Sequence, residues 1–522
     1  MCGIWGYISS SYQNDKYFVN IEHRGPDFKN LIKFNYNDYK IALGFHRLAI
    51  IDLEHGIQPF FYEYKNGEKV YLLCNGEIYN YKYLIEKYNL DTKSDCEVIL
   101  KMFLKGKNIY EIIEELDGEF AFVLLKFSGS NIEIYYGRDR FGIRPLFYRF
   151  DDTGFYFSSE LKGIKNGNGK QVEPRKVYYN NLKEENAYIY YYIGNKLNFD
   201  NNNIYESIRN SLIESVKDRM QSERPLGALL SGGLDSSLIC GIASKILKEK
   251  GERLTTFSIG MDKDSPDIVN ARKVAEHINS IHHEIIIPVD EWLNNLDNVI
   301  KQIETYDITT IRASTGQYLI SKWIKENTDI KVILNGDGSD ELTSGYLYFY
   351  NAPDADESHR ENLRLLNQIH YYDVLRVDRG ISAFGLESRV PFLSHNFVDL
   401  YLNCDKILRN PIKGKRVEKW LLRKSFQNEN IIPDEILWRQ KEAFSDGCSA
   451  LKKSWYEYIQ EYIENKVVDK EYESFPSKEA CYYYKKFKEY YPESELKVIY
   501  WQPKYTKEHG GDPSARKLKS LY

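Results

Sequence analysis

Residues 226–237, LGALLSGGLDSS, decide the fold of the second half of this 522-residue chain. The run 226–230 is short and apolar, as in a buried strand, and from 234 to 247 apolar residues recur at helical spacing. Between them, two glycines let the backbone approach an anion closely, serine hydroxyls add donors, and the helix start adds unpaired N–H groups. The stretch predicts a strand, a phosphate-binding loop and a helix, with a plain tight turn as the alternative.

This loop is not of the Walker type, because the chain contains no G-x-x-x-x-G-K-[ST] motif. Its S-G-G-x-D-S pattern resembles the pyrophosphate loop of ATP pyrophosphatases, which cleave between the α and β phosphates. That resemblance implies adenylation of a carboxylate, with pyrophosphate as the leaving group. It also implies that Asp235 holds Mg²⁺ on the departing pyrophosphate.

The rest of the second half alternates between strands and helices. Apolar runs predict strands at 254–259, 284–288 and 331–334, and a helix at 268–278. Such alternation predicts a parallel, doubly wound sheet, which binds ligands at the carboxyl ends of its strands. From residue 363 onward the pattern is mostly helical.

A second polar loop, residues 335–341 with the sequence NGDGSDE, follows the predicted strand 331–334. In a doubly wound sheet it lies on the same edge as the first loop. Its three carboxylates repel one another unless a metal or cationic groups neutralise them. A solvated acidic loop is the alternative.

The first half reads as a sheet-rich domain. Short runs broken by Gly, Asn and Asp predict strands at 41–43, 70–73, 120–125, 132–136 and 155–157. One helix is predicted at 95–104, with Ser94 or Asp95 as its N-cap. Asn- and Gly-rich segments between 165 and 203 mark a seam, so we expect one domain at 2–190 and another at 205–522.

Composition excludes several classes of function. Lys and Arg number 71 against 76 Asp and Glu, and no basic block stands out, so nucleic-acid binding is not expected. No stretch has about 18 consecutive apolar residues and no secretory leader is visible, so we expect no membrane association. The seven cysteines are scattered without metal-ligand spacing, which fits reduced thiols and a cytoplasmic location.

The chain opens with Met1-Cys2-Gly3-Ile4-Trp5-Gly6. Removal of Met1 would leave one residue with both a thiol nucleophile and a free α-amine. The amine titrates near pH ~8 and the thiol near ~8.5 in model peptides, so the amine can move protons for the sulfur. Taken alone, a cysteine at position 2 is more often an accident of the start site.

Together, the opening residues and the two loops resemble the glutamine-hydrolysing asparagine synthetases over nearly the whole chain. The resemblance is carried further by HRGPD (23–27), RLAIID (47–52), NGEIYN (75–80), ETYDITTIRAS (304–314) and ESRVPFL (387–393). It implies an N-terminal four-layer αββα sandwich of the N-terminal-nucleophile (Ntn) hydrolase fold. It also implies a C-terminal doubly wound parallel α/β domain, adenine nucleotide α-hydrolase-like, with added helices.

In the first domain, the resemblance implies a class II glutaminase in which Cys2 attacks the glutamine amide, forms a thioester and frees ammonia. The Asn75 side chain and the Gly76 N–H would form the oxyanion hole. Arg47 would pair with the glutamine α-carboxylate, and Glu77 and Asp95 with the α-ammonium. The full implied glutamine-binding set is Arg47, Leu48, Ala49, Ile50, Ile51, Asn75, Gly76, Glu77 and Asp95.

In the second domain, the resemblance implies ATP-dependent amidation of aspartate through a β-aspartyl adenylate. The implied ATP-binding residues are Leu230, Ser231, Gly232, Gly233, Asp235, Ser236, Ile259, Asn335, Gly336 and Lys441. Thr309, Thr310 and Arg312 would bind aspartate, and Asp235 and Asp340 would bind Mg²⁺. The implied partners are these small molecules, with ATP and Mg²⁺ as cofactors, and a homodimer is allowed.

One position departs from the family pattern. Members usually carry S-G-E-G-S-D-E at the second loop, whereas this chain has N-G-D-G-S-D-E. Asp337 therefore stands where the family has the Glu that is associated with forming the aspartyl adenylate. Its carboxylate is therefore retracted by one carbon–carbon bond, about 1.5 Å. We expect Asp337 to be catalytic in one of three ways: less effectively than the usual Glu, through a water molecule, or with the help of a rearranged loop.

Two alternatives stay open at this level. One is another adenylating enzyme on the same scaffold, such as a β-lactam synthetase or an amidotransferase acting on a different acid. A β-lactam synthetase would have no use for the N-terminal cysteine. A non-catalytic paralogue would explain Asp337 and Asn335 as signs of decay. Against it stand five intact polar residues of the second domain, namely Asp235, Arg312, Asp340, Glu341 and Lys441.

Overall fold

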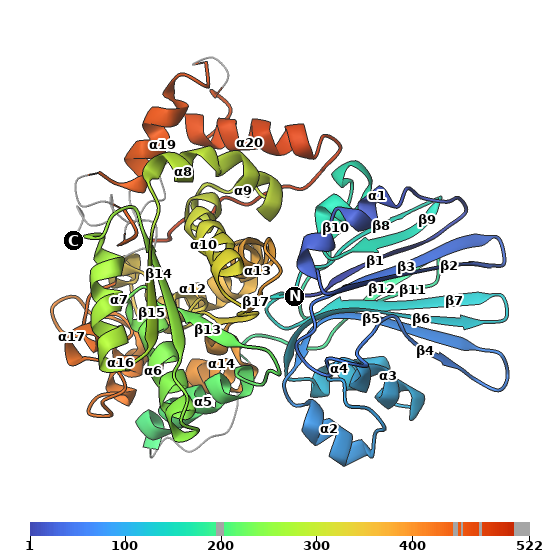
Figure 1. The fold of residues 1–522 in the computed structure, drawn as a ribbon, viewed down its shortest axis with the longest axis horizontal. Coiled ribbons are helices and arrows are strands. Elements are labelled where there is room, and N and C mark those ends of the chain that lie inside the picture. The colour runs from blue at the N-terminus through green and yellow to red at the C-terminus, as the bar shows by residue number, and fades with distance from the viewer. Residues whose placement is uncertain (195–202, 442–446, 450–452, 469–471, 506–522) are drawn as a thin grey trace.

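The computed structural model describes residues 1–194, 203–441, 447–449, 453–468 and 472–505. The chain forms two parts that lie side by side, a sheet-rich first half and a second half in which helices surround a parallel sheet (Figure 1). The predicted seam at 165–203 includes residues 195–202, and the predicted second domain ends with residues 506–522. Both of these segments lie outside the described residues.

Two six-stranded antiparallel sheets form the first half. The first has the order β10-β8-β9-β1-β3-β2 and the second β12-β11-β7-β6-β5-β4. Bounds in the first sheet are β1 (Gly3–Ser9), β2 (Phe28–Tyr36), β3 (Tyr39–Arg47), β8 (Phe147–Asp151), β9 (Gly154–Ser158) and β10 (Lys170–Gln171). Those in the second are β4 (Phe60–Glu63), β5 (Lys69–Ile78), β6 (Gly118–Ser128), β7 (Asn131–Arg138), β11 (Lys176–Asn180) and β12 (Glu185–Ile189).

The two sheets pack face to face and carry helices outside. Ile4 and Leu43 of the first sheet share one buried cluster with Leu73 and Val123 of the second. A separate buried cluster attaches α2 (Tyr81–Tyr88), α3 (Glu97–Leu104) and α4 (Ile109–Glu115) to the second sheet. Short helix α1 (Lys16–Val19) packs Phe18 against the first sheet. The order helix, sheet, sheet, helix confirms the predicted four-layer sandwich.

All five strands predicted in the first half are observed, but the predicted helix cap is wrong. The runs lie within β3, β5, β6, β7 and β9. Helix α3 begins at Glu97 with Cys96 at its N-cap and no capping side chain. Asp95 does not cap the helix, because its carboxylate accepts the Ile78 N–H at 2.9 Å at the end of β5.

The second half contains a five-stranded sheet with the order β15-β14-β13-β16-β17, in which every pair is parallel. Its strands are β13 (Leu226–Leu229), β14 (Thr255–Gly260), β15 (Ile281–Ile286), β16 (Val332–Leu334) and β17 (Glu387–Arg389). The order reverses between β13 and β16, which confirms a doubly wound sheet and sets its ligand-binding point there. The predicted strand 284–288 is shifted, because β15 is a half-exposed edge strand without a continuous apolar run.

Helices surround this sheet. Early in the second half are α5 (Ile204–Arg219), α6 (Leu234–Glu249), α7 (Pro266–His277), α8 (Val289–Asn294), α9 (Leu296–Ile303) and α10 (Ile308–Asn327). Further on are α11 (Ser339–Thr343), α12 (Ala355–Gln368), α13 (Asp373–Ser382), α14 (His395–Asn403), α15 (Lys406–Arg409), α16 (Trp420–Ser425), α17 (Asp434–Leu437), α19 (Trp455–Glu464) and α20 (Lys478–Tyr490). Within the described ranges, none of the helices has the length and apolar character needed to cross a membrane.

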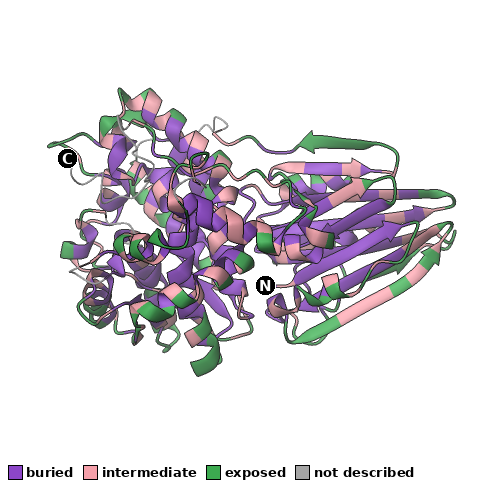
Figure 2. Ribbon diagram, turned by 90° about the horizontal axis from the view of Figure 1, so that it is seen from above, coloured by how far each residue is buried: buried purple, intermediate pink, exposed green. Residues whose placement is uncertain are grey.

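Paired charges are buried where the two halves meet. Glu119 of β6 is fully buried and accepts from Arg144 at 3.1 Å and from Arg219 of α5 at 3.2 Å. Arg24 of the first half donates to Asp378 of α13 at 2.8 Å. Figure 2 shows buried residues continuing from the sheets into the second half. Since removing one partner leaves a buried charge uncompensated, these pairs fix how the two halves sit against each other.

We expect the substitution Glu119→Gln to lower the free energy of unfolding by about 3–5 kcal/mol. The amide keeps the shape but leaves two buried arginines without their shared carboxylate. Urea unfolding of the purified chain measures the loss. The matched control is Glu63→Gln, on a half-exposed carboxylate 3.8 Å from Lys69, which should leave the unfolding curve unchanged. Equal curves for both variants would contradict a structural role for Glu119.

Candidate active sites

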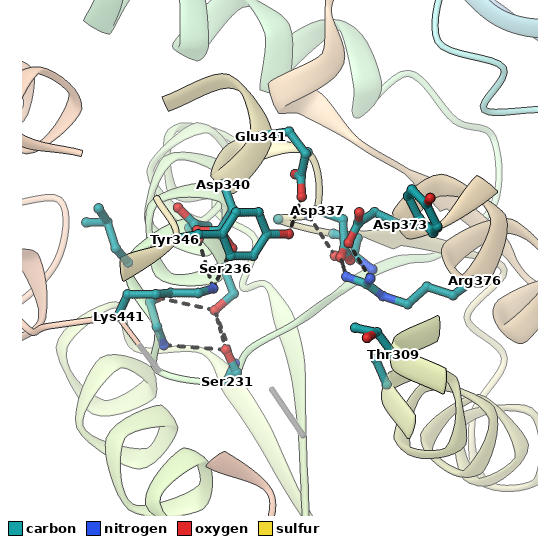
Figure 3. Close-up of a pocket in the computed structure, with 18 of the residues that line it drawn as sticks. Ser231, Ser236, Thr309, Asp337, Asp340, Glu341, Tyr346, Asp373, Arg376 and Lys441 are labelled. Carbon is teal, nitrogen blue, oxygen red and sulfur yellow. Dashed lines mark hydrogen bonds and ion pairs between the residues drawn. The ribbon is translucent and has the colours of Figure 1, made fainter. Parts of the chain in front are cut away.

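A cavity of about 240 Å³ opens at the carboxyl ends of β13 and β16, where the strand order reverses. All of its lining residues belong to the second half. Figure 3 shows Ser231 and Ser236 on one side of it and Thr309, Asp337 and Arg376 on the other. The predicted residues that line it are Ser231, Gly233, Asp235, Ser236, Thr309, Thr310, Arg312, Asn335, Gly336, Asp337, Asp340 and Lys441.

Three predicted ATP-binding residues are not among those that line the cavity. Leu230 and Ile259 are buried core side chains. Gly232 has φ +68° and packs against α7, where an added Cβ would come within 2.4 Å of the Asn270 carbonyl carbon. Gly232 therefore shapes the turn, and the nucleotide contacts of all three residues stay predictions.

The first loop is pre-formed around its hydroxyl groups. Ser231 and Ser236 place their Oγ atoms 3.0 Å apart, and the Ser231 N–H donates to Ser236 Oγ at 3.2 Å. Helix α6 then begins at Leu234, so its first N–H groups follow the glycines directly. This arrangement suits an anion at a helix N-terminus.

The two loops meet, as the doubly wound topology predicted. Ser339 Oγ of the second loop donates to Asp235 Oδ1 of the first at 2.7 Å. A Cβ added at Gly336 would lie 2.8 Å from the Ser236 nitrogen, so only glycine allows this approach. The phosphate loop and the acidic loop are thus parts of one site.

Lysines neutralise the acidic loop. Lys419 Nζ lies 2.5 Å from Asp235 Oδ2 and 2.5 Å from Asp340 Oδ1, and Lys441 Nζ lies 2.6 Å from Asp340 Oδ2. The two ammonium groups hold the pKa of Asp340 well below its usual range, against the effect of burial. The sequence required neutralising groups here but gave no sign that Lys419, buried just before α16, would be one of them.

Asp337 faces the cavity and is held from α13. One carboxylate oxygen pairs with Arg376, which also pairs with Asp373, and the other accepts from Gln317 Nε2 at 3.3 Å. Burial raises the pKa of Asp337, while the Arg376 guanidinium opposes that rise. Arg376 was missed by sequence reasoning because it belongs to none of the recognised motifs.

The three predicted aspartate-binding residues differ in their contacts. Arg312 is clamped by Glu479 of α20, with Nε–Oε1 at 2.9 Å and Nη2–Oε2 at 2.6 Å. Thr310 donates its hydroxyl to Asp307 at 2.7 Å at the start of α10. The Thr309 hydroxyl has no hydrogen-bond partner in the described part of the chain. The clamp by Glu479 was not predicted.

The first half holds a second cluster of predicted residues, in which Cys2 contacts Leu48 and interacts electrostatically with Glu77. Cys2 is half-buried, its thiol donates to the Leu48 carbonyl at 3.6 Å, and its own carbonyl accepts from Arg24 at 2.9 Å. Met1 is still attached and fully buried, with its amine 4.0 Å from Glu387 of β17. In this unprocessed chain, burial raises the pKa of the Cys2 thiol to about 12.

The Asn75 amide supports a ligand site near Cys2. It is fully buried, and neither Nδ2 nor Oδ1 has a hydrogen-bond partner among the described residues. Leaving a buried amide unpaired is costly, so the Asn75 side chain suits a polar group of a bound ligand. The next residue, Gly76, runs so close to β6 that an added Cβ would lie 2.2 Å from the Glu119 carbonyl oxygen.

Unlike Asn75, the predicted glutamine-binding side chains of Arg47, Glu77 and Asp95 already contact protein groups. Arg47 donates to the carbonyls of Leu53, at 3.0 Å, and Asp52. Glu77 lies 3.4 Å from Arg389, and burial raises the pKa of Asp95 to about 6. The segment 48–51 leads away from β3, and its Leu48 and Ile50 pack against Val332 of β16, while the Ala49 N–H donates to Asp27.

Arg389 touches both clusters and was not predicted as a site residue. Its guanidinium lies 3.4 Å from Glu77 and donates to Glu387 at 2.8 Å. Its carbonyl accepts the Asn335 N–H at 2.9 Å, at the start of the acidic loop. One residue of the second half therefore contacts a predicted glutamine-binding side chain and a predicted nucleotide-binding loop.

Comparison with known proteins finds relatives along nearly the whole chain. The family model described as "Glutamine amidotransferase domain" matches residues 1–211, and the one described as "Asparagine synthase" matches 207–358 and 352–509. A Gallus gallus protein named asparagine synthetase [glutamine-hydrolyzing] is 41% identical over 567 residues, covering 99% of both chains. Proteins of the same name from Bos taurus and Homo sapiens are 42% and 41% identical over 565 residues, covering 99% of this chain and 98% of each relative.

We expect Lys419→Met to lower the free energy of unfolding by about 3–5 kcal/mol at neutral pH, because Asp235 and Asp340 lose a shared buried cation. Lys419 depresses the folded-state pKa of Asp340, so the stability it supplies is present above the unfolded pKa of about 4 and is lost as pH falls below it. The gap between variant and wild type should therefore shrink in acid. Urea unfolding across this pH range measures it.

The double variant Lys419→Met with Asp340→Asn supplies the control. Removing one of the two facing carboxylates should recover part of the stability lost with Lys419. A further full loss in the double variant would contradict the charge-pair account.

Proposed function

Because the chain belongs to the glutamine-hydrolysing asparagine synthetases, we propose that its two clusters divide one reaction between them. The enzyme is an ATP-dependent ligase that hydrolyses glutamine and uses the ammonia to amidate aspartate, giving asparagine, glutamate, AMP and pyrophosphate. The assignment of glutamine hydrolysis to the first half rests on one observation, the buried and unpaired Asn75 amide in the cluster around Cys2. The meeting of the two loops supports the assignment of ATP to the second half.

In the glutaminase step, the Cys2 sulfur attacks the glutamine amide carbon once Met1 has been removed. The thiol proton passes through the new α-amine to the leaving nitrogen, which departs as ammonia, and water later hydrolyses the thioester. Asn75 Nδ2 and the Gly76 N–H stabilise the oxyanion. Arg47 and residues 48–51 hold the α-carboxylate end, and Glu77 and Asp95 hold the α-ammonium.

In the synthetase step, the aspartate β-carboxylate attacks the α-phosphate of ATP, and the bond to the β-phosphate breaks to release pyrophosphate. The Ser231–Ser236 loop and Lys441 surround that leaving group, and Thr309, Thr310 and Arg312 bind aspartate. Ammonia then displaces AMP from the β-aspartyl adenylate. Asp337 acts at this reacting centre, because both of its oxygens are held in the cavity wall.

Mg²⁺ is part of this proposal. Asp235 and Asp340 fit the ion, since Mg²⁺ in phosphate-transfer sites takes one or two carboxylates and completes its shell with phosphate oxygens. Their oxygens converge on Lys419 Nζ from 2.5 Å each, beside the phosphate loop. The ion would supply charge neutralisation on the departing pyrophosphate.

Further proposals concern organisation. The division into domains at 2–190 and 205–522 is supported by family models that meet near residue 210 and by sheets that stay within each half. A cytoplasmic location is supported by the scatter of the seven cysteines along the sequence, without metal-ligand spacing, which fits reduced thiols. The homodimer rests on the family resemblance alone.

The variant Cys2→Ala tests the two-site division. We expect glutamine-dependent asparagine synthesis to fall by at least about a thousandfold, because the nucleophile is lost. Synthesis from ammonium should stay within about twofold of wild type, because the second site does not use Cys2. Asparagine, AMP and pyrophosphate are measured with ATP, Mg²⁺, aspartate and either nitrogen donor.

The matched control is Cys404→Ala, at the end of α14 outside both clusters, which should keep both activities. Intact mass of the same samples shows whether Met1 has been removed. Equal loss of both activities with Cys2→Ala would contradict the division, and wild type that makes no asparagine from either donor would overturn the function.

The pKa of Asp95 should limit glutamine hydrolysis in acid. Burial raises it to about 6 in the free enzyme, and the protonated carboxyl cannot pair with the α-ammonium. We expect kcat/KM for glutamate release, without ATP, to fall about tenfold per unit below about pH 6. Asp91→Asn, at a neighbouring exposed carboxylate, should keep this profile. An acid limb near pH 4 would show that Asp95 is not the limiting group.

A further inference from the structure

Gln317 of α10 is a polar residue of the cavity wall, and it is not among the residues predicted to bind substrate, nucleotide or metal. It is only 5% exposed and lines the cavity between α10 and the acidic loop. It lies outside the family motifs quoted above. A buried amide at this point must either be satisfied within the protein or face a ligand.

One end of the amide holds Asp337. Gln317 Nε2 donates to Asp337 Oδ2 at 3.3 Å, while Oδ1 of the same carboxylate pairs with Arg376. Asp337 is the position at which this chain is one carbon–carbon bond shorter than the family pattern. The shortened carboxylate is thus held on both oxygens, and Gln317 is one of its two partners.

The other end of the amide is unpaired. Gln317 Oε1 is buried and has no hydrogen-bond partner in the part of the chain that the structure describes. Across from it on α13 stands Gly380, where even an added Cβ would remain 4.0 Å from Oε1. Leaving such an acceptor unsatisfied costs about 1–3 kcal/mol, so this oxygen suits an N–H or O–H donor from a ligand.

Building on the proposed function, we propose that Gln317 positions the nitrogen nucleophile for amide formation, its Oε1 accepting one N–H of ammonia beside Asp337. Ammonia carries several N–H groups, and the two acceptors stand next to each other through the Gln317–Asp337 hydrogen bond. In the step, the nitrogen lone pair forms the C–N bond to the β-carbonyl carbon. The C–O bond to AMP breaks with its electron pair on the AMP oxygen, and the proton lost from nitrogen passes to Asp337.

The near-isosteric variant Gln317→Met tests this role. We expect ammonium-dependent kcat/KM to fall about 10- to 100-fold, with a higher KM for ammonium. Aspartate-dependent exchange of pyrophosphate into ATP reports adenylate formation. Its fold loss should be smaller than the fold loss of ammonium-dependent synthesis by a factor of at least about ten. Glutamate release without ATP should not change, and this shows that the variant chain is folded.

Three results would overturn the inference. Unchanged synthesis would show that the amide has no part in the reaction. Equal loss of exchange and synthesis would assign Gln317 to the aspartate or ATP step. The matched control Lys322→Met, on the exposed face of the same helix, should match wild type, and a similar loss there would make the effect a general one on α10. If the wild-type enzyme made no asparagine from ammonium, that result would contradict the proposed function and not the role of Gln317.

Asp337→Glu provides an independent test of the contact. In the wild-type background the longer carboxylate must displace the Gln317 amide, so synthesis should fall while glutamate release stays unchanged. Combined with Gln317→Met, which removes the amide, Asp337→Glu should cost less than it does alone. Additive losses in the double variant would contradict a direct contact between the two residues.

Discussion

Arg389 lies where the two halves of the chain meet, and its guanidinium must neutralise the buried carboxylates Glu77 and Glu387. Because a buried charge without its partner is strongly destabilising, these three residues are confined to one arrangement. The Arg389 carbonyl then accepts from Asn335, which begins the acidic loop. This group of three charges therefore also sets how far Glu77 of the first half lies from the loop that begins at Asn335.

The cavity of the second half is also built from paired charges. Lys419 and Lys441 compensate Asp235 and Asp340, and Arg376 compensates Asp337. The two lysines hold the pKa of Asp340 well below its usual range, and all three cations keep the carboxylates close together, so the site is pre-organised. The Ser231–Ser236 loop adds neutral hydrogen-bond donors at the N-terminus of a helix, where the unpaired N–H groups favour an anion.

Cys2 and Asp337 present opposite situations. Cys2 matches the family pattern, and it follows the fully buried Met1. Asp337 is shorter than the family pattern but is held by Arg376 and Gln317. The departure seen in the sequence is thus accompanied by a partner that the sequence did not reveal.

The sequence alone determined the elements whose signals are local: the apolar strand before Ser231, the glycines of the loop, the first-half strands and the order of motifs that carries the family resemblance. It also predicted that the two loops share an edge, because parallel topology requires it. Only the tertiary structure identified Lys419, Arg376, Gln317 and Glu479. It also showed that the Asp95 carboxylate accepts the Ile78 N–H at the end of β5 and does not cap α3. The physical reason is distance along the chain, since Lys419 pairs with a carboxylate 184 residues away, and a single lysine carries no local sign of the charge it will meet.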